Sequence, residues 1–338
     1  MDSVVERYAA AAHAREDALC CPVSYDPKFL KIIPQDVLDR DYGCGDPSTY
    51  VREGETVLDL GAGGGKICFI AAQIVGPAGR VIGVDMNDDM LALARNAQSA
   101  VTAAVGYDNV EFHHGRIQDL KTDLDAVDRL LDGNPVKTAS DYKALESAIA
   151  RLRTERPLIA SDSIDVVVSN CVLNLVADHE KPTLFQEIFR VLKPGGRIAI
   201  SDIVSDRDTP AHLKEDADLW SGCISGALTE AGFAEALADA GFIGIALDKL
   251  EQNPWQVVED IEYRSATYVA YKPDTSSAAQ ARLEAIYTGP WEQVVDEAGR
   301  IYRRGERVQL SGDAASALRA GAFASQFVIF GEPEKGCC

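Results

Sequence analysis

A glycine-rich turn between a buried strand and a helix constrains this chain more than any other feature of its sequence. The strand is Thr56-Val-Leu-Asp-Leu60, the turn is Gly61-Ala-Gly-Gly-Gly65, and a helix is expected over residues 66–75. Glycine lets a ligand approach the backbone closely, and the helix N-terminus behind the turn favours a negatively charged group such as a carboxylate. The turn therefore predicts a ligand site at the carboxyl end of the first strand of an α/β sheet.

The spacing of the glycines argues against a dinucleotide as that ligand. The dinucleotide fingerprint GxGxxG would need a glycine or alanine at position 66, which is Lys66. The chain instead has the pattern GxGxG, whose glycines are Gly61, Gly63 and Gly65. The acidic Asp59 precedes this turn, and Asp85 ends the second predicted strand. Because a carboxylate at the latter position can accept both hydroxyls of a ribose, the two features together favour a ligand that contains a nucleoside.

Strands alternate with helices between residues 56 and 201, which predicts a mostly parallel, doubly wound sheet of the Rossmann-like α/β class. The predicted strands are 56–60, 80–85, 110–114, 164–169 and 197–201. Residues 121–160 are charged and expected to be helical, as an insertion on the rim of the sheet. We expect a cap segment in residues 1–47, the Rossmann-like domain in 48–205, a subdomain in 206–275, and a small C-terminal addition of unknown role, with β-rich turns, in 276–338.

The charge and composition of the 338-residue chain limit its partners. Its formal net charge is −20, which disfavours nucleic acids and anionic membrane surfaces because both need a basic patch. No run of 18 apolar residues occurs, so no transmembrane helix is expected. The N-terminus lacks the apolar stretch of a secretory signal, so we expect a cytoplasmic protein. In that reducing compartment its eight cysteines should be thiols, and without a CxxC pair they do not indicate a zinc site.

Three motifs resemble the successive motifs of class I S-adenosylmethionine-dependent methyltransferases. They are Glu55-Thr-Val-Leu-Asp-Leu-Gly-Ala-Gly-Gly-Gly65, Val84-Asp-Met86 and Leu192-Lys-Pro-Gly-Gly196, and the resemblance covers roughly residues 50–205. It implies that the backbone of residues 61–65, with Asp59 beside it, holds the methionine part of S-adenosylmethionine. It also implies that Asp85 and Met86 lie at the ribose and that Ile117, after the third strand, lies beside the adenine.

Two cysteines are predicted at the carboxyl edge of the sheet, where ligands of open α/β folds bind. Cys68 is in the first turn of the helix after the first strand, where the helix dipole favours the thiolate over the thiol. Cys171 directly follows the fourth strand, and both are therefore expected to face the crevice that holds the methyl donor. Because thiolates are soft ligands, their convergence beside a sulfonium suggests a soft, thiophilic methyl acceptor.

Two further motifs closely resemble the signatures of arsenite methyltransferases. They are Ser169-Asn-Cys-Val-Leu-Asn-Leu175 and Leu219-Trp-Ser-Gly-Cys-Ile-Ser-Gly-Ala227, and the loop Tyr42-Gly-Cys-Gly45 is similar to that family as well. The resemblance implies that Cys171 and Cys223 bind trivalent arsenic and that residues 206–275 are an arsenic-binding subdomain. By the same pattern Cys44 and Cys68 are an auxiliary pair, which serves as a third ligand or in disulfide exchange.

The implied reaction is methyl transfer from S-adenosylmethionine to trivalent arsenic, for detoxification. The substrate would be arsenite or methylarsenite as a thiol conjugate, and a glutathione- or thioredoxin-type reductant would return the product to the trivalent state. An arsenic lone pair needs no general base, in agreement with our expectation that His113 and His114 are structural. Asn170 and Asn174 are candidates for orienting the amino group of the cofactor or the arsenic ligands. We expect a monomer.

Three alternatives share part of this evidence. A methyltransferase acting on a carbon or oxygen nucleophile, such as a quinone precursor, has the same cofactor motifs but does not need converging cysteines. A protein that sequesters arsenic without turnover would not need an intact donor site, and a dinucleotide oxidoreductase is disfavoured by Lys66. The vicinal pairs Cys20-Cys21 and Cys337-Cys338 could pass arsenic inward or could be terminal thiols of no consequence.

Overall fold

The computed structural model describes residues 2–16, 19, 23–274, 283–320 and 324–331. Its centre is one mixed sheet with the strand order β3-β2-β1-β4-β5-β8-β6, and β7 pairs with β8 outside that path. The strands are β1 (Thr56–Leu60), β2 (Arg80–Asp85), β3 (Val110–His114), β4 (Ile164–Asn170), β5 (Leu192–Ser205), β6 (Ile243–Leu250), β7 (Gln256–Val258) and β8 (Ile261–Tyr271). β1 to β5 are parallel, whereas β8 runs antiparallel to β5 and β6. The strand order reverses between β1 and β4, so a crevice opens there at the carboxyl ends of the strands.

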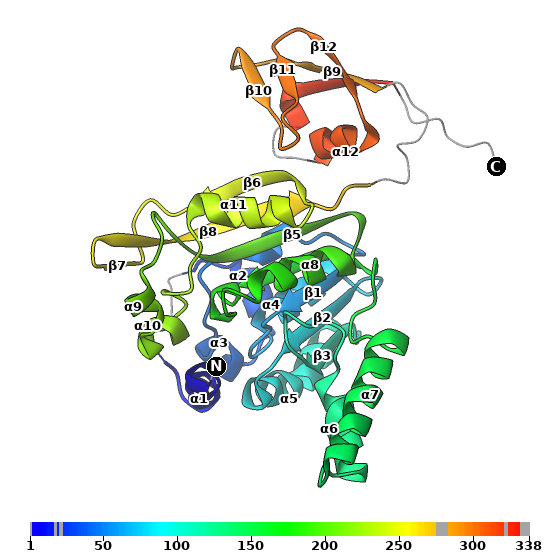
Figure 1. Cartoon of the computed structure of the whole chain (residues 1–338), viewed down its shortest axis with the longest axis vertical. Coiled ribbons are helices and arrows are strands. Elements are labelled where there is room, and N and C mark those ends of the chain that lie inside the picture. The colour runs from blue at the N-terminus through cyan, green and yellow to red at the C-terminus, as the bar shows by residue number, and fades with distance from the viewer. Residues whose placement is uncertain (1, 17–18, 20–22, 275–282, 321–323, 332–338) are drawn as a thin grey trace, which may run out of the picture.

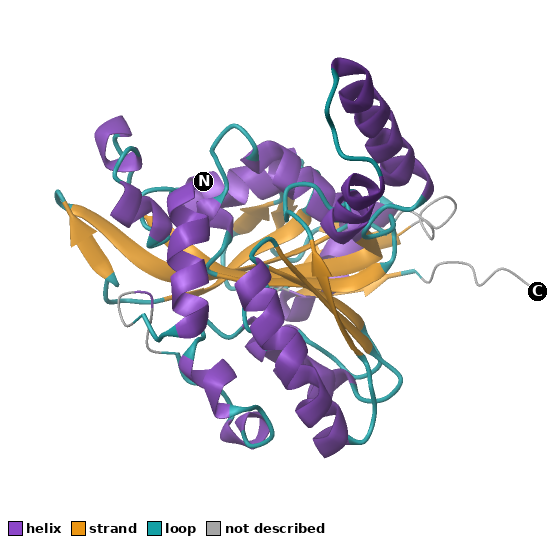
Figure 2. Ribbon diagram, turned by 90° about the horizontal axis from the view of Figure 1, so that it is seen from below, coloured by secondary structure: helices purple, strands orange, loops and turns teal. Residues whose placement is uncertain are grey.

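Helices cover both faces of this sheet (Figures 1 and 2). They are α1 (Asp2–His13), α2 (Pro27–Leu30), α3 (Gln35–Asp39), α4 (Lys66–Val75), α5 (Asp88–Val105), α6 (Leu124–Gly133), α7 (Ala139–Glu155), α8 (Lys181–Val191), α9 (Ala211–Lys214), α10 (Ala217–Ser221) and α11 (Glu230–Asp239), with 3-10 turns at Pro47–Tyr50 and Leu173–Leu175. Successive strand residues point to opposite faces, so Val57 packs in the core under α4 and α5, and Leu58 in the core under α8 and α11. No helix within the described ranges is long and apolar enough to cross a membrane.

The Rossmann-like fold expected from the sequence is confirmed. β1, β2 and β3 have the predicted bounds, and β4 ends one residue later, at Asn170. β5 is longer than predicted because its carboxyl half continues to pair with β8, from Arg197↔Tyr271 to Ser205↔Tyr263. The insertion between β3 and β4 is helical as expected, and α6 and α7 form a hairpin that projects past the β3 edge of the sheet (Figure 1).

Residues 206–275 do more than the sequence indicates, because they supply two long strands to the main sheet. β8 lies between β5 and β6, and all three pair side by side. A boundary at residue 205 therefore runs through one continuous sheet. The second half of β6 is exposed, so this edge strand lacks the continuous apolar run that marks the central strands.

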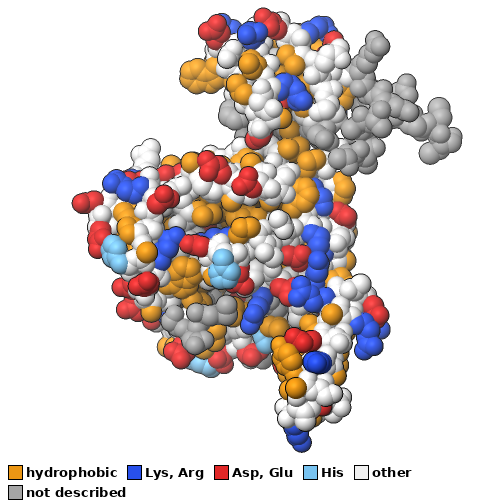
Figure 3. Space-filling model, in the orientation of Figure 1, with side chains coloured by type: hydrophobic (Ala, Val, Ile, Leu, Met, Phe, Trp, Pro, Cys, Tyr) orange, Lys and Arg blue, Asp and Glu red, His pale blue; other side chains and the backbone are white. Residues whose placement is uncertain are grey.

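Residues 283–330 form a small β-rich unit with a core of its own. Its elements are β9 (Leu283–Tyr287), β10 (Gln293–Val295), β11 (Ile301–Arg303), β12 (Arg307–Leu310), α12 (Gly312–Ala320), a 3-10 turn (Ala324–Gln326) and β13 (Phe327–Phe330). Its buried core residues are Leu283, Ala285, Tyr287, Tyr302, Leu310 and Ala315. The unit meets the main domain beside β6, where apolar side chains gather at the junction (Figure 3).

Candidate functional site

A pocket of about 1120 Å³, part of it open solvent, lies in the crevice between β1 and β4. Its walls come from the glycine turn, the ends of β2 and β3, the loop before the Pro47–Tyr50 turn, and α1. The residues predicted to bind the cofactor that line it are Asp59, Gly61, Gly63, Asp85, Met86, Ile117 and Asn170. Gly65 lies behind this wall, where it caps the N-terminus of α4. The pocket lies where the sequence places the donor.

The glycine turn needs its glycines because its backbone is left-handed. The φ angles are +71° at Gly61, +51° at Gly63 and +87° at Gly65, a region that other residues rarely adopt. A Cβ at Gly61 would also lie 2.4 Å from Cγ1 of Val172, whereas at Gly63 it would meet open space. The turn therefore offers bare backbone to a ligand, with the N-terminus of α4 directly behind it.

Asp85 anchors this turn and remains able to bind a ribose. Its Oδ2 accepts the N–H of Gly63 at 2.8 Å, and its Oδ1 accepts the N–H of Asn87, also at 2.8 Å. A carboxylate can accept about four hydrogen bonds, so both oxygens keep capacity for hydroxyl groups. Burial raises the pKa of Asp85, and the hydrogen bonds from these two N–H groups oppose that rise.

Cys68 does not face the crevice, and this expectation was wrong. Its side chain is fully buried in the core between α4 and the sheet, and its S–H donates to Oδ2 of Asp59 at 3.2 Å. Burial and the neighbouring carboxyl raise the pKa of Cys68 well above that of a free thiol. The helix dipole was expected to favour a thiolate here, but loss of solvation outweighs it. The sulfur therefore stays a neutral thiol that supports Asp59.

The thiols of Cys44, Cys171 and Cys223 lie together in a different core cluster. Each is buried and free of disulfide bonding, with 4–6% of its surface exposed. The S–H of Cys223 donates to the carbonyl oxygen of Cys171 at 2.9 Å, and Cys171 also lines the donor pocket. The structure thus joins Cys44, rather than Cys68, to the two cysteines expected to bind arsenic.

Cys171 and Cys223 both adopt a strained backbone. Each has φ = +61°, which is uncommon for a residue with a side chain and is found where the surroundings enforce it. The amide of Asn174 donates to the carbonyl oxygens of Cys223 (3.1 Å) and Ile203 (2.7 Å), and the buried Asp202 accepts the N–H of Leu173 at 2.8 Å. Asn174 therefore orients the Cys223 backbone.

Asn170 holds the Cys44 loop and not a ligand. Its Oδ1 accepts the N–H groups of Cys44 (2.9 Å) and Gly45 (3.0 Å), while its Nδ2 donates to the carbonyl of Gly45 (2.8 Å) and the hydroxyl of Tyr25 (3.2 Å). These four bonds use the full capacity of the amide. The expectation that Asn170 orients the cofactor's amino group is wrong for this conformation, although its side chain borders the pocket.

Lys66, the residue that excludes a dinucleotide fingerprint, is a second anchor of this loop. Its Nζ lies 2.7 Å from Oδ2 of Asp41 and 3.7 Å above the ring of Tyr25. The side chain is only about a tenth exposed, so ion pair and ring together compensate the buried charge. Glycine turn and cysteine loop are therefore fastened to each other.

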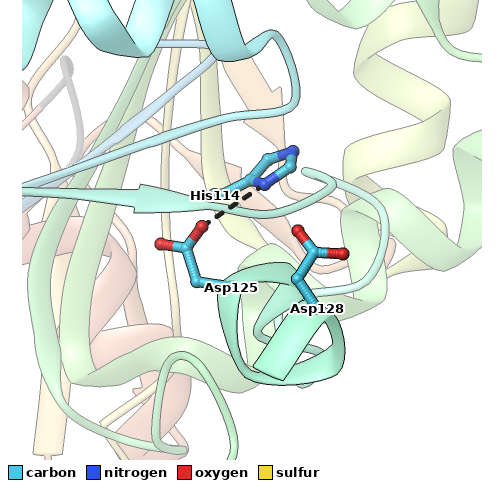
Figure 4. Close-up of side chains that lie close together, drawn as sticks. All are labelled: His114, Asp125 and Asp128. Atoms are coloured by element: carbon cyan, nitrogen blue, oxygen red, sulfur yellow. Dashed lines mark ion pairs between the residues drawn. The ribbon is translucent and has the colours of Figure 1, made fainter. Parts of the chain in front are cut away.

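His114, at the end of β3, lies beside carboxylates (Figure 4). Its ring, Asp125 and Asp128 are the one trio of His, Cys, Asp or Glu side chains in the described ranges whose ligand atoms all lie within 4.8 Å of one another. His114 Nδ1 is 3.4 Å from Asp88 and 3.5 Å from Asp125, and both carboxylates sit in the first turns of helices, where they stabilise the helix dipole. These contacts agree with the structural role expected for His114. The thiols of Cys44, Cys171 and Cys223 are more widely spaced than this trio, so a shared ligand requires their side chains to rotate.

Tyr8, on α1, is a site residue that the sequence analysis did not identify. It lines the donor pocket, and its hydroxyl lies 3.8 Å from Sγ of Cys223. Nothing in the sequence signals this contact, because the two residues are 215 positions apart. The vicinal cysteines at 20–21 and 337–338 lie outside the described residues.

The pocket at the strand-order reversal, the bare glycine turn and Asp85 define a class I S-adenosylmethionine-dependent methyltransferase. In agreement, a family model described as a methyltransferase domain matches residues 52–156 and 140–254, and a domain of unknown function matches residues 275–336. The crystal structure of an arsenic(III) S-adenosylmethionine methyltransferase from Chlamydomonas reinhardtii has the same fold, with a TM-score of 0.60 over 93% of this chain and 98% of that one, at 24% identity.

Sequence relatives narrow this class to one family. The arsenite methyltransferase of Halobacterium salinarum is 36% identical over 80% of this chain and 66% of its own length. The arsenite methyltransferase of mouse is 30% identical over 90% of this chain and 75% of its own length. The chain belongs to the arsenite methyltransferase family, although it spans only about two thirds of the archaeal relative.

Proposed function

We propose that this chain transfers the methyl group of S-adenosylmethionine to trivalent arsenic bound by Cys171 and Cys223, with Cys44 as the third thiol. The observation that carries the proposal is the buried cluster of these three thiols, one of which also lines the donor pocket. A soft substrate explains soft ligands at this place. A quinone methyltransferase would have no use for them, and family membership supports the same choice.

The residues of the donor pocket fit S-adenosylmethionine, which supplies a methyl group activated by a sulfonium. The turn at residues 61–65 offers N–H groups and a helix N-terminus to the carboxylate of its methionine part. Asp85 would accept the ribose hydroxyls. Ile117, which is 7% exposed and lines the pocket, would pack against the adenine. Together these residues would position the donor.

The thiols load the acceptor by exchange. Each cysteine S–H replaces one thiol of an arsenic–thiol conjugate, so a sulfur–arsenic bond forms, another breaks, and the proton leaves with the departing thiol. Arsenic on Cys171 would face the donor pocket, where its lone pair would need no general base to accept the methyl group. The protein contributes placement, while the chemistry resides in donor and arsenic.

Methyl transfer leaves arsenic pentavalent, so a trivalent product needs two electrons. Two thiols supply them and become a disulfide, which a glutathione- or thioredoxin-type thiol then reduces. Cys44 suits this step better than Cys68, because Cys68 is enclosed in the core beneath α4 with its S–H on Asp59, whereas Cys44 lies in the cluster of Cys171 and Cys223. Free thiols need a reducing compartment, so we place this function in the cytoplasm, in a monomer, as part of arsenic detoxification.

Single cysteine-to-serine variants test the assignment. Cys171→Ser should lose arsenite methylation by more than roughly a hundredfold, since a direct ligand matters more than the outer-shell partners of ligands. Cys44→Ser should weaken arsenite binding, whereas Cys68→Ser, whose hydroxyl can still donate to Asp59, should bind arsenite normally. Methylated arsenic is measured with labelled S-adenosylmethionine, arsenite and a thiol reductant, and donor binding is measured by calorimetry.

Donor affinity is the internal control for Cys44→Ser and Cys171→Ser, because neither substitution touches the ribose or glycine-turn contacts. A Cys171→Ser protein that still methylates arsenite would refute the proposal. A Cys68→Ser protein that loses arsenite binding while Cys44→Ser keeps it would restore Cys68 as the third ligand.

A further inference from the structure

Side-chain hydrogen bonds fix α1, the helix that carries Tyr8, on two of its sides. On one side of α1, Nη1 of Arg7 donates to the carbonyl oxygen of Asp218 (3.0 Å) and to the hydroxyl of Ser221 (2.9 Å), two residues before Cys223. On the other side, Nδ2 of Asn87 donates to the carbonyl oxygen of Val5 at 3.2 Å, two residues after the ribose ligand Asp85. α1 therefore spans the distance between donor site and arsenic site.

The hydroxyl of Tyr8 meets the sulfur of Cys223 as a hydrogen-bond donor. The two atoms are 3.8 Å apart, a distance at which sulfur still accepts a hydrogen bond. Either atom could donate, but the single proton of the Cys223 thiol already points to the carbonyl oxygen of Cys171 at 2.9 Å. The phenol O–H is the proton that remains for this contact.

We propose that Tyr8 is a positioning residue of the arsenic site, whose phenol holds the Cys223 sulfur and stabilises the thiolate with which that residue attacks arsenic. The inference rests on the proposed function of Cys223. When the thiol gives up its proton, which passes to the departing thiol of the conjugate, the Cys171 carbonyl loses its donor. The phenol keeps its own, and a hydrogen bond to a charged sulfur is stronger than one to a neutral sulfur.

The surroundings keep Tyr8 in the form that this role needs. Burial raises the pKa of Tyr8 well above its usual value, and the neighbouring thiols of Cys223 and Cys171 raise it further. The phenol therefore stays protonated wherever arsenic exchange is feasible. Donating to a thiolate is the stabilising arrangement, since a phenolate beside the same sulfur would repel it.

Packing is the competing explanation for Tyr8. Its ring meets the ring of Tyr42 edge-on, with centroids 6.2 Å apart, and Tyr42 in turn donates to the carbonyl oxygen of Ala11 at 3.0 Å. These contacts fasten α1 to the Cys44 loop, and they need only the ring of Tyr8. Removing the hydroxyl alone therefore separates the two explanations.

The test is Tyr8→Phe, with Tyr142→Phe on the exposed side of α7 as the matched control. The rate of Cys223 alkylation by iodoacetamide is measured at a fixed pH by peptide mass spectrometry, and steady-state methylation of arsenite is measured in parallel. We expect Cys223 labelling to slow by about tenfold in Tyr8→Phe, corresponding to loss of one hydrogen bond to a charged group. The KM for arsenite should rise more than kcat falls, with donor affinity unchanged.

Each outcome separates this proposal from the proposed function. A labelling rate and KM equal to those of the wild type would overturn the role of Tyr8, even if arsenite is methylated. A wild-type protein that methylates no arsenite overturns the proposed function, and the labelling rate still reports on the Tyr8–Cys223 contact, because it uses no arsenic.

Discussion

Asp59 is the residue at which burial has the clearest chemical consequence. Asp59 is only 2% exposed. Burial raises the pKa of its carboxyl to about 7, although the hydrogen bond from the S–H of Cys68 opposes that rise. Asp59 also lines the donor pocket. Its protonation near neutral pH therefore depends on the charge of whatever occupies that pocket.

The affinity for S-adenosylmethionine should rise with pH. The donor carries positive charge on its sulfonium and ammonium groups, so binding favours ionised Asp59. Below pH 7 the carboxyl must lose its proton on binding, and we expect the affinity to increase by up to about tenfold per pH unit until it levels off above that pKa. Titration calorimetry in buffers with different heats of ionisation measures both the affinity and the proton released.

Asp59→Asn is the control for this pH dependence. An amide oxygen can still accept the S–H bond from Cys68 but cannot ionise, so the slope should flatten. Asp85, whose pKa burial also raises, should leave a weaker residual slope. If the wild-type affinity is constant or falls as pH increases, Asp59 does not respond to the donor's charge.

Motif spacing could predict the glycine turn and the residue at a strand end, because their place in the fold follows from their place in the chain. It could not predict residues whose role depends on the direction in which a helix side chain points or on contacts between distant segments. The turn at 61–65 and Asp85 follow from chain positions alone. Cys68 does not, because successive helix residues turn by about 100° and the first turn has both inward and outward positions. Tyr8 depends on tertiary packing across 215 residues, for which no local signal exists.

At the scale of elements, the loop of residues 41–45 is the part of the arsenic site that is built most tightly. Asn170, at the end of β4, binds its backbone at Cys44 and Gly45, and Lys66, at the start of α4, pairs with Asp41. Ser265 on β8 donates to the carbonyl oxygen of Cys44 at 2.6 Å. Three elements of the main domain therefore fix where this thiol lies.

Gly43→Ala should release this loop. A Cβ at Gly43 would lie 2.1 Å from Nδ2 and 2.6 Å from Cγ of Asn170, so the amide must move and its bonds to Cys44 and Gly45 must break. We expect a loss of about 1–3 kcal/mol in unfolding free energy, as for other overpacked sites, and a clearly weaker affinity for arsenite. Urea denaturation and arsenite-binding titrations measure the two effects.

Gly133→Ala is the matched control, since a Cβ at this last residue of α6 would meet open space. Removing a helical glycine there should stabilise the protein by up to about 1 kcal/mol and leave arsenite binding unchanged. A Gly43→Ala protein as stable and as avid for arsenite as the wild type would show that the loop tolerates loss of the Asn170 bonds.

The central strands could be predicted, because full burial makes them continuous apolar runs with glycine or polar residues at their ends. β6 and β8 lack this signal. β6 is a half-exposed edge strand with irregular register, and β8 is defined by long-range pairing with β5, which local sequence patterns do not indicate. The expected boundary at residue 205 followed from that weakness.

At the scale of the whole molecule, the site and the C-terminal unit are built from separate parts of the described chain. The donor pocket and the thiol cluster are built from residues between 4 and 263, and none of their members belongs to the 283–330 unit. That unit touches the outside of β6, where Oε1 of Glu297 accepts the N–H of Ile245 at 3.2 Å. It covers the sheet edge farthest from β3 and does not enter the site.

Removal of residues 275–338 should therefore leave donor binding intact and lower stability only modestly. The cut exposes the outer side of β6, including Ile243 and Ile245, and frees an edge strand to pair with other chains. We expect the affinity for S-adenosylmethionine to stay within about twofold, because no contact to the pocket is lost, and Tm to fall by roughly 2–6 °C. Calorimetry and thermal unfolding measure these values, and light scattering measures association of the exposed edge.

Glu297→Ala in the full chain is the control, since it removes one hydrogen bond and leaves the edge covered. If the shortened chain is unfolded by circular dichroism or no longer binds the donor, the C-terminal unit is part of the catalytic fold, and the predicted boundary at residue 276 is wrong.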